Sequence, residues 1–290
     1  MAGVPAGRLL ISVVALAVFL SAAPRALTIE TRARAIEVGE VILVTITTDA
    51  PADEVRVRAF DRDHPAFKES PLVWRALVGI DLDAVPGPYS LRVDVRAGAV
   101  QSQAARELTV LRHAFPTRQL TVDDAYVNPP AATLERIAKE ARELDRIWTS
   151  PSATRLWTGA FQRPVPQANN SAFGSRSVFN GEPRSPHSGA DFQSPAGQAI
   201  AAPNAGKVVL ARDLYFTGNT VIIDHGLGLF SMMAHLSAVD VSEGDAVSAG
   251  TIVGKVGATG RVTGPHLHWA IRLNGARVDP LSLLFVLDGQ

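Results

Sequence analysis

The sequence predicts a mainly β protein in which two strand-rich parts are joined by a single long helix. Three patterns support this fold class. Short segments of alternating apolar and polar residues fill the first third of the chain, one segment with helical spacing follows, and apolar segments bounded by glycine fill the remainder. The 290 residues are enough for two domains, and 47% of them are hydrophobic, so each part can bury a core.

Residues 1–26 have the pattern of a targeting segment and are set apart from the fold. Arg8 precedes an apolar run of about fifteen residues, Leu9–Ala23, which is typical of a secretory signal and short for a membrane-spanning helix. Ala23 ends a candidate cleavage site, and Pro24 after it hinders cleavage. We expect export to the periplasm or cell envelope, with membrane contact only through this segment if it stays uncleaved.

Residues 27–112 are predicted to form an immunoglobulin-like β-sandwich. Several short alternating segments follow one another at the spacing that such sandwiches show, and a Pro-Gly-Pro turn separates two of them. No constellation of charged residues stands out, so this part is interpreted as non-catalytic. The predicted strands lie within Leu27–Thr48, Glu54–Phe60, Trp74–Leu82, Val85–Gly98 and Ala105–Leu111.

Residues 113–160 are predicted to be a linker that carries an amphipathic helix. Asn128 can cap the start of this helix, and the prolines after it are tolerated in a first turn. We expect the helix to pack on one or both β-rich parts. Its apolar residues recur at every third or fourth position: Leu134, Ile137, Ala141, Leu144 and Trp148.

Residues 161–290 are predicted to form a second all-β domain. Its strands are bounded by glycines, and the pair Asn274-Gly275 is a strong hairpin signal. The segment Arg163–Pro186 shows neither strand nor helix spacing, so we expect an irregular loop. Loops of that length near a site are often functional. We hypothesise that this one partly covers a groove, an idea motivated by Asn169, Asn170 and Asn180.

Charge balance and the absence of cysteine exclude several classes of function. The 28 basic and 28 acidic side chains cancel, whereas a general nucleic-acid binder needs a basic excess, so no nucleic-acid partner is expected. The chain contains no cysteine, which excludes disulfides, thiolate zinc sites and cysteine nucleophiles.

The placement of histidines is the strongest functional signal. In a strand, His266 and His268 share one face, and the residues of the other face are uniformly apolar. His187 and Asp191 can also converge on one point, and His235 ends an apolar strand. Imidazoles with one carboxylate suit zinc, and a catalytic zinc takes three protein ligands and leaves a position for water. Two further histidines could then handle protons.

The remaining histidines are interpreted as structural or are left without a role. His225 is read as a satisfied histidine at the end of a strand, beside a glycine-rich turn, and Asp224 next to it is read as a turn residue. His64 and His113 lie in the first part of the chain and at its exit, and no function is assigned to them.

Four segments together resemble the LytM- and lysostaphin-type zinc metallopeptidases, the twenty-third metallopeptidase family. The segments are FGSRSVFNGEPRSPHSGADFQSPAGQAIAAPNAGKVV, GNTVIIDHGLGLFSMMAHLS, VSEGDAVSAGTIVGKVGATGRVTGPHLHWAI and RVDPLSLL. Their order and spacing are similar to those of the family from Phe161 to Leu284. The N-terminal β module and the stretch before the helix also resemble a subgroup of exported members.

The resemblance implies an all-β, lysostaphin-type catalytic domain whose groove is crossed by antiparallel strands. It implies one zinc ion per chain, held by His187, Asp191 and His268, with His235 and His266 as the catalytic pair. The implied function is a zinc-dependent endopeptidase that hydrolyses peptide cross-links of bacterial peptidoglycan during cell-wall remodelling. Peptidoglycan peptides are then the expected partner, with an envelope activator or regulator as a further candidate.

Met233 departs from the family pattern, which commonly has a tyrosine two residues before the histidine that aligns with His235. Methionine fills apolar space but cannot donate a strong hydrogen bond, so the preference for substrate can differ.

Three other interpretations stay open at this point. The chain could be a non-hydrolytic wall-binding or activating module that retains its metal residues. It could be an envelope protein with a purely structural zinc, which would have four protein ligands. It could also be a peptidase that acts on a glycine-rich protein.

Overall fold

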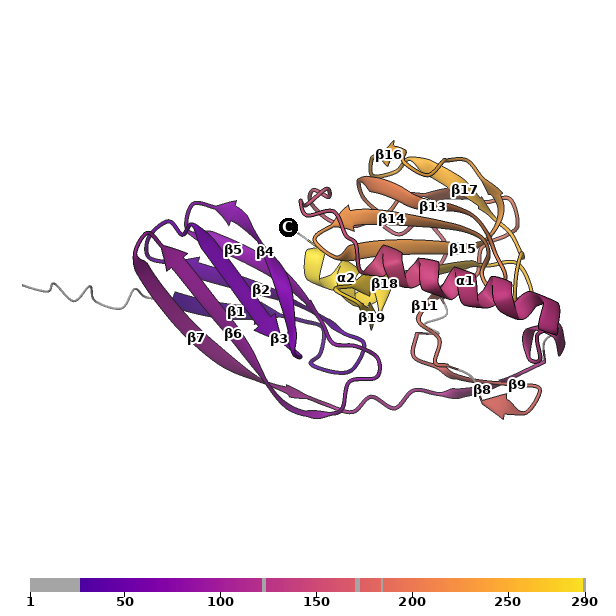
Figure 1. The fold of residues 1–290 in the computed structure, drawn as a ribbon, viewed down its shortest axis with the longest axis horizontal. Helices are drawn as coiled ribbons and strands as arrows, with labels where there is room; N and C mark the ends of the chain where they lie inside the picture. The colour runs from indigo at the N-terminus through magenta and orange to yellow at the C-terminus, as the bar shows by residue number, and fades with distance from the viewer. Residues whose placement is uncertain (1–26, 122–123, 170–172, 184, 289–290) are drawn as a thin grey trace, which may run out of the picture.

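The computed structural model describes residues 27–121, 124–169, 173–183 and 185–288, so the predicted targeting segment lies outside it. Figure 1 shows two β-rich bodies side by side, with a long helix lying along one of them. The fold is therefore mainly β, as predicted. Within the described residues, no helix is both long enough and apolar enough to cross a membrane.

The N-terminal body is a sandwich of two antiparallel sheets. Its strand order, β1-β2-β5-β4 followed by β3-β6-β7, corresponds to the A-B-E-D and C-F-G sheets of an immunoglobulin-like domain. The Tyr89 hydroxyl donates to the Val85 carbonyl at 2.7 Å, in the corner arrangement found in such sandwiches. The predicted immunoglobulin-like fold is confirmed. Its strands are β1 (Leu27–Arg32), β2 (Val41–Thr48), β3 (Glu54–Ala59), β4 (Arg62–Ser70), β5 (Val73–Gly79), β6 (Gly87–Ala97) and β7 (Val100–Val110).

Strand β4 is absent from the sequence-based prediction. It contains Pro65, which has no backbone N–H to give to a sheet, and its polar residues do not alternate with apolar ones. The strand forms because its neighbours on both sides supply pairing: Pro65 lies opposite Arg56 of β3, and Ala66 lies opposite Ala76 of β5.

The linker contains one strand, one short turn and one long helix. Strand β8 (Thr117–Leu120) pairs in parallel with β9 (Arg176–Phe179), so the segment expected to be irregular contains strand structure. A 3-10 turn, η1 (Asp124–Tyr126), follows β8. Helix α1 (Ala131–Trp148) then runs along the outer face of the C-terminal sheet (Figure 1).

The predicted amphipathic helix is present, but its expected cap is wrong. The helix begins after Pro130, and no side chain bonds to its first turn. Asn128 instead donates to the Asp124 carboxylate at 2.9 Å, because two prolines separate it from the helix. The last turns of α1 press an apolar face onto the C-terminal sheet: Leu144, Ile147 and Trp148 pack on Leu210, Leu214, Ile222 and Phe230.

The C-terminal body is a nine-stranded sheet with a fully buried core. Its main order is β11-β18-β15-β14-β13-β16, with β12, β17 and β19 paired beside it. The predicted apolar face of β18 is confirmed, since Leu267, Trp269, Ile271 and Leu273 are all buried. The strands are β11 (Gly189–Phe192), β12 (Ala199–Ala201), β13 (Gly206–Leu214), β14 (Gly218–Gly226), β15 (Leu229–Val239), β16 (Ala246–Val247), β17 (Ile252–Val256), β18 (Leu267–Leu273) and β19 (Ala276–Val278), and β10 (Glu182–Pro183) pairs with β9 outside this sheet.

The two bodies share one apolar core. Val41, Leu43 and Leu77 of the sandwich belong to the same buried cluster as Trp269 and Leu283 of the C-terminal body. Burial of apolar surface is the main favourable term in folding. The two bodies are therefore expected to unfold as one unit.

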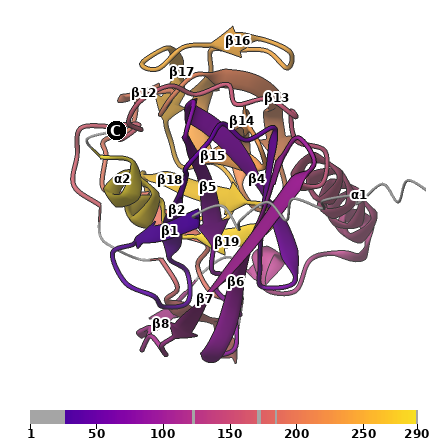
Figure 2. The ribbon, with the colours of Figure 1, turned by 90° about the vertical axis from the view of Figure 1, so that its left-hand side faces the viewer.

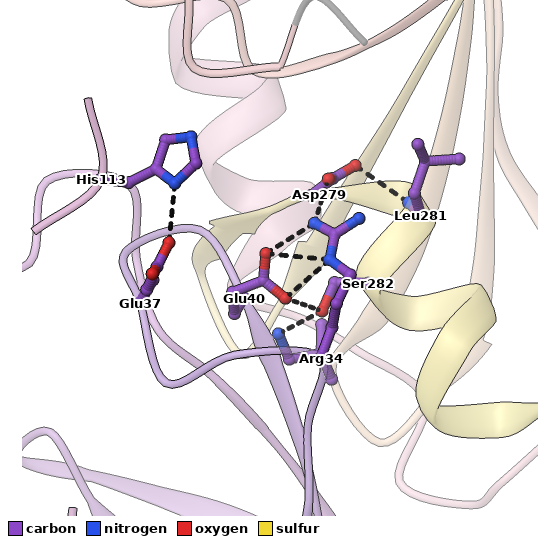
Figure 3. Close-up of polar contacts among 8 residues, drawn as sticks. Arg34, Glu37, Glu40, His113, Asp279, Leu281 and Ser282 are labelled. Atoms are coloured by element: carbon purple, nitrogen blue, oxygen red, sulfur yellow. Dashed lines mark hydrogen bonds and ion pairs between the residues drawn. The ribbon is translucent and has the colours of Figure 1, made fainter. Parts of the chain in front are cut away.

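A polar network closes the same contact at α2 (Pro280–Leu287), which lies beside β1 and β2 (Figure 2). Figure 3 shows Arg34 between two carboxylates, and its Nη2 atom is 2.5 Å from an oxygen of Glu40 and 2.5 Å from an oxygen of Asp279. Asp279 also caps α2, because its side chain accepts from the Leu281 N–H. The Asp279 carboxylate thus caps α2 and also forms an ion pair with Arg34 of the sandwich.

Ser282 completes this network from inside α2. Its hydroxyl accepts from the Val41 N–H at 2.9 Å and donates to a Glu40 oxygen at 2.8 Å. At the edge of the contact, the His113 ring nitrogen lies 2.7 Å from a Glu37 oxygen (Figure 3).

Candidate active site

Three neighbouring strands of the C-terminal sheet bring the site together. β18 is paired with β11 on one side and with β15 on the other. In this register His268 lies directly opposite Asp191 on β11 and opposite Ala234 on β15. Residues opposite each other in a sheet point to the same face. The side chains of Asp191 and His268 therefore meet, although 77 positions separate them in the chain.

His187, Asp191 and His268 form a compact cluster of possible metal ligands. The Asp191 Oδ1 atom is 3.0 Å from His187 Nε2 and 3.0 Å from His268 Nδ1, and the two ring nitrogens are also 3.0 Å apart. Ligand atoms around a tetrahedral zinc are about 3.3 Å apart, given bonds of about 2.0–2.1 Å. The spacing and the two-nitrogen, one-oxygen donor set therefore both fit zinc.

Gly189 makes room for this cluster and was not identified from the sequence. A Cβ atom at this position would lie 2.6 Å from the Trp269 carbonyl and 2.7 Å from the His268 ring. The ring of His268 therefore occupies the space that a side chain would need. The one signal for Gly189 in the sequence is its position between His187 and Asp191.

The electrostatics of the cluster favour an ionised Asp191 carboxylate and a neutral His268 imidazole. Burial alone would raise the pKa of Asp191, but hydrogen bonds with His187 and His268 outweigh burial and place the pKa far below its ordinary value. Burial lowers the pKa of His268, and the bond with Asp191 opposes that shift without cancelling it. A carboxylate and neutral imidazoles are the forms that bind a metal ion.

A β-bulge turns His235 toward the same cluster. In a regular strand His235 would share a face with Met233, which is fully buried in the core. On β15 the residues between Met233 and Leu236 oppose a single position of β14, which defines a bulge. His235 itself has φ of +68°, a conformation that non-glycine residues seldom adopt. Its ring centre consequently lies 5.8 Å from that of His268.

His266 and His235 are held with the same ring nitrogen toward the cluster. The His266 Nδ1–H donates to the Gly264 carbonyl at 2.9 Å, and the His235 Nδ1–H donates to the Thr259 carbonyl at 2.9 Å. Each neutral ring therefore carries its lone pair on Nε2. The His266 Nε2 atom is 3.8 Å from Asp191 Oδ1. The ring centres of His266 and His235 are 5.0 Å apart.

Burial keeps His235 uncharged. Burial is the largest cause of its lowered pKa, the neighbouring His268 and His266 add to the effect, and together they bring the pKa to about 3. His235 can therefore accept a hydrogen bond across the neutral pH range. Of the two catalytic candidates, His266 is the more open, with 17% of its side chain exposed.

The cluster lies in a groove of about 370 Å³. The described part of the segment Arg163–Pro186 contributes to one wall of the groove, and His187 and Asp191 keep 21% and 15% of their side chains exposed. Of the three asparagines that motivated the idea of a partial cover, Asn169 pairs with Phe192 of β11, Asn170 lies outside the described residues, and Asn180 does not line the groove. The described residues of this segment that line the groove are Ser177, Phe179, Ser185 and Pro186.

The two methionines before His235 face different surroundings. Met233 lies opposite Trp269 and is fully buried in the core, so the position where the family commonly has tyrosine does not line the groove. Met232 lines it instead.

Asp224 and His225 are structural residues of β14. His225 lies buried one residue before the end of the strand, as predicted, whereas Asp224, which was expected in a turn, is buried within the strand. The Asp224 carboxylate accepts from the N–H and hydroxyl of Ser152, and His225 bonds to the Ala205 carbonyl and the Ser231 hydroxyl, both at 2.8 Å.

Comparisons with known proteins agree with this geometry. Residues 185–280 match the model of peptidase family M23. A crystal structure from Pseudomonas aeruginosa that is assigned to peptidase M23 is 34% identical to this chain, with a TM-score of 0.68, over 87% of this chain and 96% of that one. The chain belongs to peptidase family M23. The family predicted from the sequence is thereby confirmed.

Curated relatives match this M23 peptidase over a shorter stretch. The DD-carboxypeptidase/endopeptidase Mpg of Neisseria meningitidis is 41% identical over 97 residues, which are 33% of this chain and 22% of Mpg. The peptidoglycan DD-endopeptidase ShyA of Vibrio cholerae is 40% identical over 97 residues, which are 33% of this chain and 23% of ShyA. The match thus spans less than a quarter of the length of these relatives.

Proposed function

We propose that this M23 peptidase is a zinc-dependent endopeptidase that hydrolyses peptide cross-links of bacterial peptidoglycan. The observation that carries the proposal is the convergence of one carboxylate and four imidazoles in a single groove. Two relatives that match a third of its length are named for endopeptidase activity, one of them on peptidoglycan. The proposal includes export to the envelope, which rests on the sequence of residues 1–26.

His187, Asp191 and His268 are the proposed zinc ligands. When bound, zinc supplies a Lewis acid that polarises a peptide carbonyl and makes water a nucleophile at neutral pH. The three side chains contribute a fixed donor set: paired strands place two of them, and Gly189 leaves space for the His268 ring. Because three ligand atoms converge among the residues that the structure describes, a fourth position is left for water or substrate.

His266 and His235 are the proposed proton-handling pair. His266 presents its unprotonated Nε2 toward the groove and can take the proton of the attacking water. His235, which burial keeps neutral, can accept a second hydrogen bond from that water and orient it. After the attack, a protonated His266 can return its proton to the amine that leaves. General acid–base catalysis of this kind contributes about 10²- to 10⁴-fold in rate.

The test is digestion of purified cross-linked peptidoglycan by the zinc-loaded protein, with muropeptides identified by mass. We expect release of un-cross-linked muropeptides by the wild type, and loss of release both with a chelator and in His266→Ala. The mass of the products identifies the bond that is cut. Zinc bound without any release would favour the non-hydrolytic wall-binding module. Cleavage of a glycine-rich protein alone would favour the protein-directed peptidase.

A further inference from the structure

The wall of the groove contains a basic residue that lies outside the stretch matched by the family model. Strand β8, from the linker, pairs in parallel with β9 and lies below β11 in Figure 1. In this register Arg118 is the partner of Ser177, and both residues line the groove together with Phe179. The family model matches residues 185–280 only, so this wall is an addition to the matched region.

Arg118 takes part in no ion pair with any residue in the described part of the chain. Among the described residues that line the groove, Asp191 is the single carboxylate, and its charge is directed at His187 and His268. Arg118 therefore brings a positive charge to the same groove that contains the proposed metal ligands. A guanidinium in such a place binds carboxylates through two parallel hydrogen bonds.

We propose that Arg118 is a substrate-binding residue that recognises a carboxylate of the peptide beside the bond to be cut. This inference rests on the proposed function, and it names the chemical feature that the groove would select. Wall peptides carry such groups at their C-terminal ends and on side chains, and either source presents the same chemistry to the guanidinium. Strand pairing fixes the backbone of Arg118, so the guanidinium reaches the groove from a defined position.

The neighbouring strand offers a matched control. Arg176 lies next to Ser177 on β9, is exposed, and does not line the groove. Side chains alternate between the two faces of a strand, so Arg176 points away from the groove while Ser177 and Phe179 point into it. Replacing Arg176 removes the same charge from the same wall without touching the groove.

The experiment measures peptide binding rather than turnover. Zinc-loaded His266→Ala protein is titrated into labelled cross-linked peptides, and fluorescence anisotropy is recorded. One pair of peptides differs by a C-terminal carboxylate or carboxamide, and a second pair differs by a side-chain carboxylate or carboxamide. The variants Arg118→Gln and Arg176→Gln are compared in this background, with thermal unfolding as the check on folding.

We expect Arg118→Gln to weaken binding of a carboxylate peptide by roughly tenfold to a hundredfold, the size of one charge-assisted hydrogen bond. The matching carboxamide peptide should bind both proteins equally, and Arg176→Gln should change neither. The peptide pair whose binding changes in Arg118→Gln identifies the source of the carboxylate, either a C-terminus or a side chain.

Three results would overturn the inference: equal weakening of acid and amide peptides, an equal effect of Arg176→Gln, or no binding of any peptide. Cleavage of the same peptides by the protein with His266 intact is scored separately. Absence of cleavage with the expected binding pattern would reject the proposed function and retain the role of Arg118.

Discussion

Asp191 and His268 face each other across two antiparallel strands, and Asp191 Oδ1 is 3.0 Å from His268 Nδ1. The same oxygen is 3.0 Å from His187 Nε2. Strand register therefore places two of the three donor atoms, those of Asp191 and His268, around the point that His187 also reaches. A bound cation would replace the hydrogen bonds that Asp191 makes with the two rings.

Replacing Asp191 by asparagine should weaken zinc binding by more than about 100-fold, since even partners of metal ligands contribute 10- to 100-fold. His266→Ala should bind one zinc per chain with nearly unchanged affinity, because its ring is outside the trio. Competition with a chromophoric chelator at pH 7 measures both affinities. An equal loss in the two variants would show that the ligand assignment is wrong.

Gly189→Ala should weaken zinc binding by about 10- to 100-fold without changing any ligand. The new methyl group would overlap the His268 ring and the Trp269 carbonyl, so the ring must move. Gly264→Ala is the matched control, since a Cβ there would meet no atom within 4 Å. The same chelator competition applies, and equal affinities of the two variants would contradict the steric argument.

Alanine substitutions of Met233 and Met232 should affect different properties, the first mainly stability and the second mainly substrate binding. Met233→Ala removes a fully buried side chain from the core and should lower the free energy of unfolding by about 2–5 kcal/mol, with KM unchanged. Met232→Ala should cost less stability and raise KM, because Met232 lines the groove. Urea unfolding and steady-state kinetics on one peptide test the pair, and a raised KM in Met233→Ala would contradict the assignment.

Ser282→Ala should destabilise the contact between the two bodies. It leaves the Val41 N–H without its acceptor and removes a hydrogen bond to Glu40, at a cost of about 1–3 kcal/mol for buried groups. Ser90→Ala, at an exposed position of β6, should change stability by less than about 0.5 kcal/mol. Urea unfolding should show one transition in both variants, because the bodies share a core. Two separate transitions in the wild type would disprove that coupling.

Sequence spacing identifies the side chains of the site but not the backbone that arranges them. His266 and His268 follow the period of a strand, so their common direction is predictable. The orientation of His235 depends on a bulge with φ of +68°, which a regular period cannot reveal. Arg118 reaches the groove through parallel pairing of segments 59 positions apart, which no local pattern encodes.

Two elements of the fold are not predicted from the sequence, for different reasons. Strand β4 contains a proline and lacks alternation, so its pairing with neighbours overrides its own propensity. Helix α2 has a start signal in the sequence, because Asp279 is a capping residue and Pro280 is a first-turn proline. Its short apolar sequence resembles a buried strand as much as a helix.

His225 should make the stability of the metal-free protein fall as the pH is lowered. Burial brings its pKa to about 4, whereas the unfolded chain has the ordinary value of about 6.5. Between these two pKa values, His225 binds a proton in the unfolded state but not in the folded state. The free energy of unfolding therefore holds its full value above about pH 6.5 and loses up to about 3 kcal/mol by pH 4.

His225→Gln isolates this contribution from those of the other titrating groups. The variant should be less stable at pH 7, because the bonds to Ala205 and Ser231 are disturbed. Its free energy of unfolding should nevertheless fall less steeply than that of the wild type between pH 6.5 and pH 4, so the two curves converge. Urea unfolding in the presence of a chelator, at several pH values, measures the difference. Parallel curves would mean that the pKa of His225 is the same in the folded and the unfolded protein, and would contradict the shift.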